Sequence, residues 1–218
     1  MSFWDSAENV ARFAAREPDV RLAQLVHDYA DPRAVRVLDL GCAGGRNAVF
    51  LAARGFDVFA VDASEAMVAE TRRRLAPLVG EAEAARCARV GRMDDLGWAA
   101  DASFQLVVAL GIYHCAQSRA EWDRALSETA RALVSGGKLL VSVFTPETDL
   151  TGRGIVPVPG EPHVYEGFES GRSVLVDAAA LDAELARHGF VPLVPTAIAR
   201  PRVEVGRRVS ANGLYVKR

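Results

Sequence analysis

A chain of 218 residues, half of them hydrophobic and a quarter charged, has the length and composition of one globular domain. Its formal net charge of −2 leaves no basic excess to bind a nucleic-acid backbone. No apolar run reaches the roughly 18 residues that a membrane-spanning helix needs, and residues 1–9 lack the regions of a secretory signal. We therefore expect a cytoplasmic protein that binds neither nucleic acid nor membrane.

Residues 1–34 have the pattern of a helical cap. Apolar residues recur at helical spacing on both sides of Pro18, which predicts two helices separated by this proline. Phe3 and Trp4 precede the first helix and form either an aromatic lid or, as the favoured alternative, a packing contact within the cap.

Strands and helices alternate over residues 35–144, the predicted core of the domain. The alternation predicts a parallel sheet with right-handed crossovers. The main apolar runs contain few polar residues, so helices are expected on both faces of a doubly wound α/β sheet. Strands are expected at 35–40, 57–61, 104–110 and 138–144, with a weaker one at 85–90, and helices at 46–54, 64–75 and 119–133.

The alternation of strands and helices ends at residues 145–176, which are rich in proline and glycine. A connection longer than about 12–15 residues without its own structure is uncommon, so we predict an irregular lid or insert. Residues 177–218 then resume with a helix at 177–189 and strands at 190–193 and 214–216. The whole chain, 1–218, is thus expected to be a single domain.

The three cysteines, Cys42, Cys87 and Cys115, are far apart and form no C-x-x-C pair. Reduced thiols are therefore expected, rather than disulfides or a zinc site. No metal site is predicted.

A glycine-rich turn, Gly41 to Gly45, joins the first strand to the following helix. Glycine permits a close approach of ligand to backbone, and the first N–H groups of a helix are available to bind it. The next strand ends in Asp62, about 20 residues later, where an acid can accept both hydroxyls of a ribose. This pattern predicts a nucleotide-type cofactor.

Three features oppose a nicotinamide dinucleotide as that cofactor. The G-x-G-x-x-G pattern requires glycine at the positions of Ala43 and Arg46. Asp39, close to the end of the strand, would repel a pyrophosphate but attract an ammonium group. The turn also follows about 40 residues of chain, whereas dinucleotide-binding folds more often begin with this strand.

The segment Val37-Leu-Asp-Leu-Gly-Cys-Ala-Gly-Gly-Arg-Asn47, followed by Val61-Asp62-Ala-Ser-Glu-Ala-Met67, resembles the signature of class I S-adenosylmethionine-dependent methyltransferases. The usual form is D-x-G-x-G-x-G, and Ala43 replaces its middle glycine. The resemblance extends over roughly residues 35–145, through Arg92-Met-Asp-Asp-Leu96, the strand and loop at 104–114, and the turn at 132–140. It implies a Rossmann-like, seven-stranded sheet whose last strand is antiparallel, and a core over 35–144 that binds the cofactor.

The resemblance also implies an activity, the transfer of a methyl group from S-adenosylmethionine to a small-molecule O, N, S or C nucleophile. Asp39 and Gly41 would lie by the methionine portion of the cofactor, and Asp62 would hold its ribose. Asp94 would hydrogen-bond the adenine amino group, with Met93 beside the ring. The implied cofactor-binding residues are Asp39, Gly41, Cys42, Ala43, Gly45, Arg46, Asp62, Ala63, Met67, Met93, Asp94, Leu110 and Gly111.

Some of these assignments have structural alternatives. Met67 either flanks the adenine or belongs to the core. Arg46 either reaches the cofactor carboxylate or is an exposed helix arginine. Asp62 could instead cap the following helix.

For the chemistry, His114 is the candidate general base, because it follows the fourth strand at the edge where open α/β sheets bind ligands. A structural histidine is the alternative. Tyr113 is a candidate to line the acceptor pocket or to support the loop. Arg202, Arg207 and Arg208 would favour an acidic acceptor if they faced the site, although a surface strand is the alternative.

Two other functions are weighed against the methyltransferase. One is a non-catalytic module that binds S-adenosylmethionine, and the other is an NAD-dependent oxidoreductase, which Asp39, Arg46 and Asp94 disfavour. The expected partner is a small-molecule acceptor, and the protein is expected to be a monomer or a homodimer.

Overall fold

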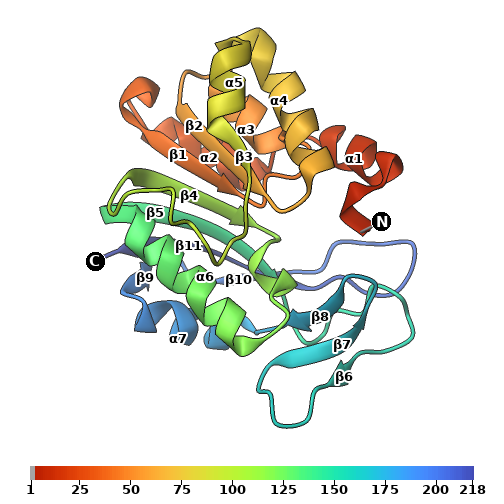
Figure 1. Ribbon diagram of the computed structural model, residues 1–218. Helices are drawn as coiled ribbons and strands as arrows, with labels where there is room; N and C mark the ends of the chain where they lie inside the picture. Colours follow the sequence, from red (N-terminus) through yellow and green to blue (C-terminus); the bar gives the residue numbers. More distant parts are fainter. Residues whose placement is uncertain (1–2) are drawn as a thin grey trace.

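The computed structural model describes residues 3–218, apart from the side chain of Phe3, so the lid hypothesis for Phe3 lies outside the described residues. A large, mostly parallel sheet forms the centre, with helices on both faces (Figure 1). This confirms the predicted α/β class. Within the described part of the chain, no helix has both the length and the apolar character needed to cross a bilayer.

The sheet has the strand order β10-β11-β5-β4-β1-β2-β3. All neighbouring strands from β3 to β5 are parallel, and β11 is antiparallel to β5, as the resemblance implies. The position beyond β11 is shared by two short strands, β9 and β10, because Pro195 lies between them and cannot donate to the ladder. The strands are β1 (Arg36–Leu40), β2 (Asp57–Asp62), β3 (Ala88–Val90), β4 (Phe104–Leu110), β5 (Leu133–Phe144), β9 (Phe190–Pro192), β10 (Ala197–Ala199) and β11 (Ser210–Lys217).

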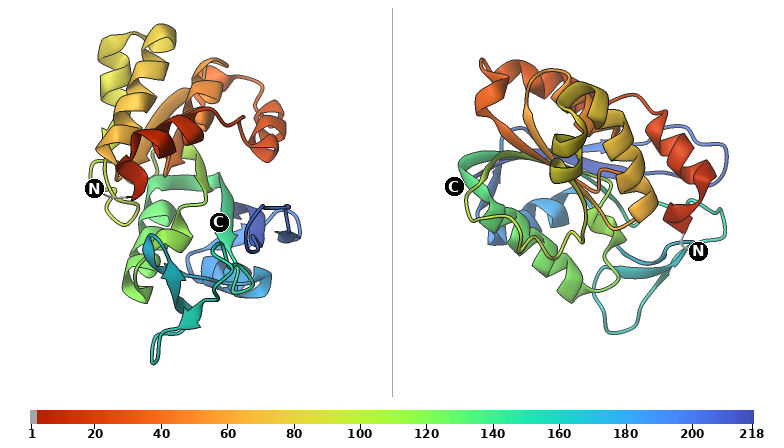
Figure 2. Two further views of the ribbon diagram at one scale, coloured as in Figure 1. Left: turned by 90° about the vertical axis from the view of Figure 1, so that its right-hand side faces the viewer. Right: turned by 45° about the horizontal axis from the view of Figure 1, so that its top comes forward.

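Successive residues of the central strands face opposite layers of the molecule. Val37 packs in a core with the helices α2 to α5, whereas Leu38 packs in a core with α6 and α7. The two layers of helices are visible in the rotated views (Figure 2). The helices are α1 (Ala7–Ala14), α2 (Val20–Leu25), α3 (Arg46–Ala52), α4 (Glu65–Val79), α5 (Glu81–Cys87), α6 (Arg119–Ala132) and α7 (Ala178–Arg187), with short 3-10 helices η1 (Phe3–Asp5), η2 (Val26–Asp28), η3 (Pro32–Ala34) and η4 (Tyr113–Cys115).

Two predicted boundaries around the third strand are wrong. Helix α5 occupies the first part of the predicted strand 85–90, since its Ala- and Glu-rich sequence favours a helix. Helix α4 continues past its predicted end at Leu75 to Val79. Pro77 lies in the last turn of α4, where its missing N–H group removes only one hydrogen bond.

The segment predicted to be irregular contains a small antiparallel sheet of β6 (Val156–Pro157), β7 (Val164–Phe168) and β8 (Gly171–Val174). The expectation of an irregular segment is therefore wrong for these residues. The strands are short, and a register shift between Tyr165 and Phe168 interrupts the alternation that marks a longer strand. The Gln117 side chain joins this sheet to the main domain through two hydrogen bonds to the Arg172 backbone, at 2.9 and 3.0 Å.

Candidate functional site

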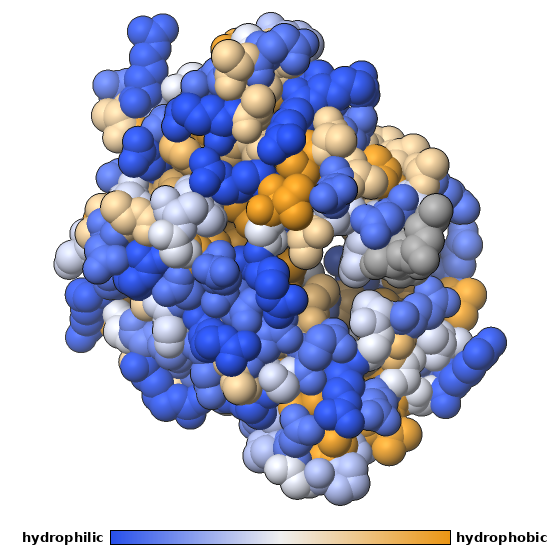
Figure 3. Space-filling view, in the orientation of Figure 1, coloured by the Kyte–Doolittle hydropathy of each residue, from blue (hydrophilic) through white to orange (hydrophobic). Residues whose placement is uncertain are grey.

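A cavity of about 740 Å³ lies at the carboxyl ends of β1, β2 and β4, within the size range of small-molecule sites. In the orientation of Figure 1, the surface is hollowed at this edge of the sheet, between α1 and β8 (Figure 3). The turns that leave the strands form its base. Residues of η1 and α1, and residues 203–208 before β11, complete its walls.

The glycine turn between β1 and α3 is tied to the neighbouring strand. The N–H groups of Gly41 and Cys42 both donate to the Val61 carbonyl, at 2.8 and 3.0 Å. Gly41 has a φ of +74°, and a Cβ there would lie 2.7 Å from the Cβ of Ile112. Ala43 has a φ of 47°, a left-handed conformation that costs alanine more than glycine. The turn thus places backbone along the base of the cavity.

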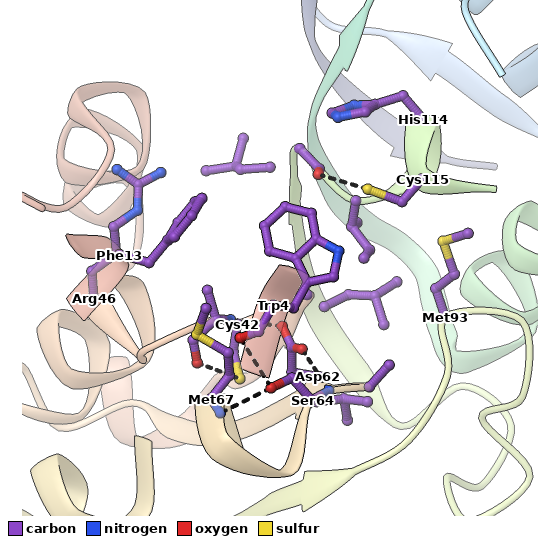
Figure 4. A pocket seen from close by; sticks show the side chains of 18 of the residues that line it. Trp4, Phe13, Cys42, Arg46, Asp62, Ser64, Met67, Met93, His114 and Cys115 are labelled. Atoms are coloured by element: carbon purple, nitrogen blue, oxygen red, sulfur yellow. Dashed lines mark hydrogen bonds between the residues drawn. The ribbon is translucent and has the colours of Figure 1, made fainter. Parts of the chain in front are cut away.

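Asp62, at the end of β2, faces the cavity beside this turn (Figure 4). Its Oδ2 atom accepts from the Ala43 N–H group at 2.9 Å, and its Oδ1 atom accepts from the Ser64 N–H group at 3.0 Å. Burial raises the pKa of Asp62, and these N–H groups oppose that rise. Each carboxylate oxygen has a second lone pair, so Asp62 retains the capacity to accept from two ligand hydroxyls.

Ser64 caps α4 and also links the N-terminal segment to the site. Its Oγ atom accepts from the Met67 N–H group at 3.2 Å and donates to Asp5 Oδ1 at 2.6 Å. Trp4 of η1 and Phe13 of α1 pack edge to face, with ring centroids 5.5 Å apart, and both line the cavity. The predicted cap therefore forms part of the site.

Asp39 is buried and does not line the cavity. Among the described residues, its Oδ2 atom has no hydrogen-bond partner. Burial raises the pKa of Asp39 to about 7, although the charge of Arg46 and the Ala48 N–H group oppose the rise. A buried carboxyl with a free oxygen is suited to a cationic or hydrogen-bond-donating neighbour.

Asp39 should make the ligand-free protein less stable as the pH rises from about 4 to 7, whereas His114, whose pKa is lowered to about 3, contributes in the opposite direction over much of this window. Between the ordinary pKa of Asp39, 3.8, and its raised value of about 7, the folded state binds more protons than the unfolded state. The contribution of Asp39 to the free energy of unfolding therefore falls with rising pH in this window. Asp39→Asn should remove this contribution and make the slope of the unfolding free energy against pH more positive, whereas Asp123→Asn, at an exposed carboxyl on α6, should leave the slope unchanged. Urea denaturation across the window measures both, and an equal slope in wild type and Asp39→Asn would contradict the assignment.

Asp94 does not reach the cavity, contrary to its predicted contact with an adenine ring. Its two carboxylate oxygens accept from Arg92 at 2.9 Å and from Arg124 at 2.8 Å. Burial opposes ionisation, but these two hydrogen bonds lower the pKa of Asp94. Arg92 and Met93 line the cavity in its place.

Gly45 and Tyr113 support the site without lining it. Gly45 precedes α3 with a φ of +78°, and a Cβ there would lie 2.9 Å from the Thr71 side chain. Tyr113 is fully buried, and its hydroxyl lies 2.7 Å from that of Thr129. The predicted residues that do line the cavity are Gly41, Cys42, Ala43, Arg46, Asp62, Ala63, Met67, Met93, Leu110, Gly111 and His114.

The geometry of His114 does not suit a general base. Its ring stacks on Phe144 with centroids 3.9 Å apart, and its Nδ1 atom accepts from the Phe144 N–H group at 3.3 Å. In the neutral ring the proton is then on Nε2, which is a donor. Burial and the charge of Arg208 lower the pKa of His114 to about 3. We therefore interpret His114 as a neutral hydrogen-bond donor, not as the predicted base.

His114 should remain neutral from pH 8 to pH 5, because its pKa lies well below this range. Nitrogen-15 NMR of labelled histidine rings should show the Nε2-protonated neutral form throughout. The exposed rings of His27 and His163 provide the comparison in the same spectra. A His114 resonance that titrates near pH 6.5 would restore the base hypothesis.

Several residues of the cavity wall are missed by the sequence pattern, most of all those of the N-terminal helix. Arg12 and Phe13 of α1 and the adjacent Arg16 line the cavity, as does Cys115. The cluster Arg202, Arg207 and Arg208 is visible in the sequence, but only Arg208 of the three lines the cavity. Burial raises the pKa of Cys115 to about 12, so its thiol is not a nucleophile at neutral pH.

Residues 37–137 match the family model of a methyltransferase domain. This part of the chain is similar to methyltransferase domains. This match covers the glycine turn, Asp62 and the loop after β4, and so includes the base of the cavity. The remaining walls of the cavity come from residues outside the match, in the N-terminal cap and the last third of the chain.

Solved structures share the fold of this chain at low identity. One is a SAM-dependent methyltransferase from Methanosarcina mazei, with 16% identity, a TM-score of 0.66, and coverage of 88% of this chain and 96% of that one. The 1,6-didemethyltoxoflavin-N1-methyltransferase of Burkholderia thailandensis, with bound 1,6-didemethyltoxoflavin and S-adenosylhomocysteine, has 20% identity, a TM-score of 0.65, and coverage of 97% and 80%. The CcbJ methyltransferase of Streptomyces caelestis has 23% identity, a TM-score of 0.62, and coverage of 94% and 98%. No curated protein sequence matches the chain.

Proposed function

We propose that the protein binds S-adenosylmethionine in this cavity and transfers its methyl group to a small molecule. The observation that carries the proposal is the contact of Asp62 with the Gly41–Gly45 turn at the base of a large cavity. Both lie in the part of the chain that matches a methyltransferase domain. The Burkholderia thailandensis structure, which has S-adenosylhomocysteine bound, supports the same class of cofactor.

The residues present fit this cofactor. Asp62 has free lone pairs for the ribose hydroxyls, and the Gly41–Gly45 turn places backbone along the base of the cavity. Asp39 does not line the cavity and is assigned no contact with the cofactor. Met67 and Met93 offer apolar surface for the adenine, and Arg46 offers a cation for the carboxylate. When bound, the cofactor supplies an electrophilic methyl group on its sulfonium.

The chain's own contribution to the reaction is to position the acceptor and exclude water. Trp4 and Phe13 cover the cavity from the N-terminal side, and the Nε2–H group of His114 is available to orient an acceptor atom. Positioning of this kind can lower a barrier by several kcal/mol.

The groups in the cavity that could take a proton are engaged elsewhere. Asp5 accepts from Ser64, Asp62 is assigned to the ribose hydroxyls of the cofactor, and Glu121 forms an ion pair with Arg92 at 2.7 Å. His114 has its Nδ1 atom occupied. We therefore propose an acceptor whose nucleophilic atom loses its proton readily or carries none.

A methyl-transfer screen tests the proposal. The protein is incubated with S-adenosylmethionine carrying a labelled methyl group and with panels of phenols, carboxylic acids, amines, thiols and N-heterocycles. We expect S-adenosylhomocysteine and a labelled product in equal amounts with at least one acceptor class. Binding of S-adenosylmethionine without turnover across the panels would favour the non-catalytic module instead, and absence of binding would contradict both.

A further inference from the structure

Four arginines from separate parts of the chain line one side of the cavity. Arg12 is in α1, Arg16 follows α1, Arg46 begins α3, and Arg208 precedes β11. Within residues 3–218, none of these four side chains forms an ion pair with a carboxylate, although 17 ion pairs are present elsewhere. The cavity therefore contains cationic groups that form no direct ion pair with the described residues, although the charge of Asp19 acts on Arg46 and Arg208.

The contacts of these arginines are with neutral groups. Arg16 and Arg208 each lie over an aromatic ring, at 4.1 and 5.4 Å from the ring centroid. The other two donate to an amide and to a backbone carbonyl. The four partners are the Phe13 ring for Arg16, the Phe144 ring for Arg208, Asn9 Oδ1 at 2.5 Å for Arg12, and the Glu17 carbonyl at 2.9 Å for Arg46.

The arginines are close enough for their charges to act on one another. Burial, and then the charges of Arg208, Arg46 and Arg12, lower the pKa of Arg16. Burial and the charge of Arg46 similarly lower the pKa of Arg208. Arg46 and Arg208 are half-buried, whereas Arg12 and Arg16 are exposed. Like charges close to half-buried groups repel one another, and a ligand of opposite charge would relieve this repulsion.

The acidic groups of the cavity lie apart from this cluster in the hydrogen-bond network. Asp5 and Asp62 are joined through Ser64, and Glu121 is paired with Arg92. The close-up shows Arg46 and Phe13 on one side of the cavity and Met93 on the other (Figure 4). S-adenosylmethionine has a single carboxylate and a net positive charge, so it can pair with one arginine but cannot neutralise the cluster.

We propose that the methyl acceptor is an organic oxyanion, a carboxylate or phosphate on an apolar body, and that Arg208 and Arg16 bind its charged group. This inference rests on the proposed function. Arg208 lies over the same Phe144 ring that stacks on His114, so the Nε2–H group of His114 is a further donor on this side. Apolar surface for the body of the acceptor is provided by Ile112, Leu150, Val203 and Val205.

Matched pairs of charged and neutral probes test this inference. Isothermal titration calorimetry would compare 1-naphthoate with 1-naphthamide, and phenyl phosphate with phenol, on protein with and without saturating S-adenosylhomocysteine. The variants are Arg208→Gln and, as the control, Arg202→Gln, an exposed arginine of the same loop that does not line the cavity. The affinity of each variant for S-adenosylhomocysteine checks that it is folded.

In the wild type, at least one anion should bind tenfold or more tightly than its neutral partner. The anion with the larger preference shows whether the site takes a carboxylate or a phosphate. Arg208→Gln should remove that preference while leaving the affinity for S-adenosylhomocysteine within about twofold, and Arg202→Gln should change neither. Equal binding of anions and neutral partners, or equal effects of the two variants, would overturn the inference. Failure of S-adenosylhomocysteine to bind the wild type would instead refute the proposed function, while the titrations without it still test the arginines.

Discussion

Asp62→Ala should weaken the binding of S-adenosylmethionine by more than tenfold, which corresponds to about 1.4 kcal/mol or more. The carboxylate of Asp62 faces the cavity and also holds the N–H groups of Ala43 and Ser64. Its removal takes away the proposed acceptor for the ribose hydroxyls and leaves two N–H groups without their partner. The glycine turn and the start of α4 both lose an anchor, so the effect extends beyond one ligand contact.

Calorimetric titration of wild type, Asp62→Asn and Asp62→Ala with S-adenosylmethionine measures this effect. Asp62→Asn keeps one acceptor oxygen and should fall between the other two proteins. Asp57→Ala is the matched control, because Asp57 lies at the opposite end of the same strand and forms an exposed ion pair with Arg36 at 3.0 Å. An affinity of Asp62→Ala equal to that of the control would remove Asp62 from the site.

Gly41→Ala should destabilise the folded protein by about 2–4 kcal/mol and reduce cofactor binding strongly. The left-handed backbone, with a φ of +74°, is one cause, since it disfavours any residue with a Cβ atom. The other cause is steric, because the new Cβ would lie only 2.7 Å from the Cβ of Ile112. Because Gly41 and Cys42 donate to Val61, a shift of the turn would also disturb the alignment of β1 with β2.

Gly55→Ala separates these two causes. Gly55 also has a positive φ, +86°, but its nearest neighbour to a new Cβ is the Arg33 side chain at 3.7 Å. This control should therefore lose only the backbone contribution, about 1–2 kcal/mol, and should bind S-adenosylmethionine as wild type does. Urea denaturation of the three proteins measures the difference, and equal losses in both variants would show that Ile112 does not constrain the turn.

The central strands can be predicted from the sequence because each is a nearly unbroken apolar run between turn residues. Residues 35–40, 57–61 and 104–110 all coincide with strands of the structure. The small sheet of β6 to β8 cannot be predicted in this way, because its strands have two to five residues and contain Pro157 and Gly167. Propensity in so short a strand carries little weight against its tertiary contacts.

The parts of the site that lie next to the central strands are likewise predictable. Gly41 and Asp62 can be predicted as site residues because Gly41 comes directly after an apolar strand and Asp62 ends the next one. Arg16 and Arg208 come from distant segments, and an amphipathic helix or a polar loop does not specify which surface it covers. The predicted contact of Asp94 with an adenine ring is wrong for a related reason. Its partner Arg124 lies 30 residues away in sequence, and the sequence pattern does not show that the two residues meet.

Calorimetric titration of the wild-type protein with S-adenosylmethionine, beside a titration with NAD, tests the central claim most directly. We expect one molecule of S-adenosylmethionine to bind per chain, and no saturable heat from NAD under the same conditions. The opposite outcome, saturable binding of NAD and none of S-adenosylmethionine, would contradict the assignment of the cavity.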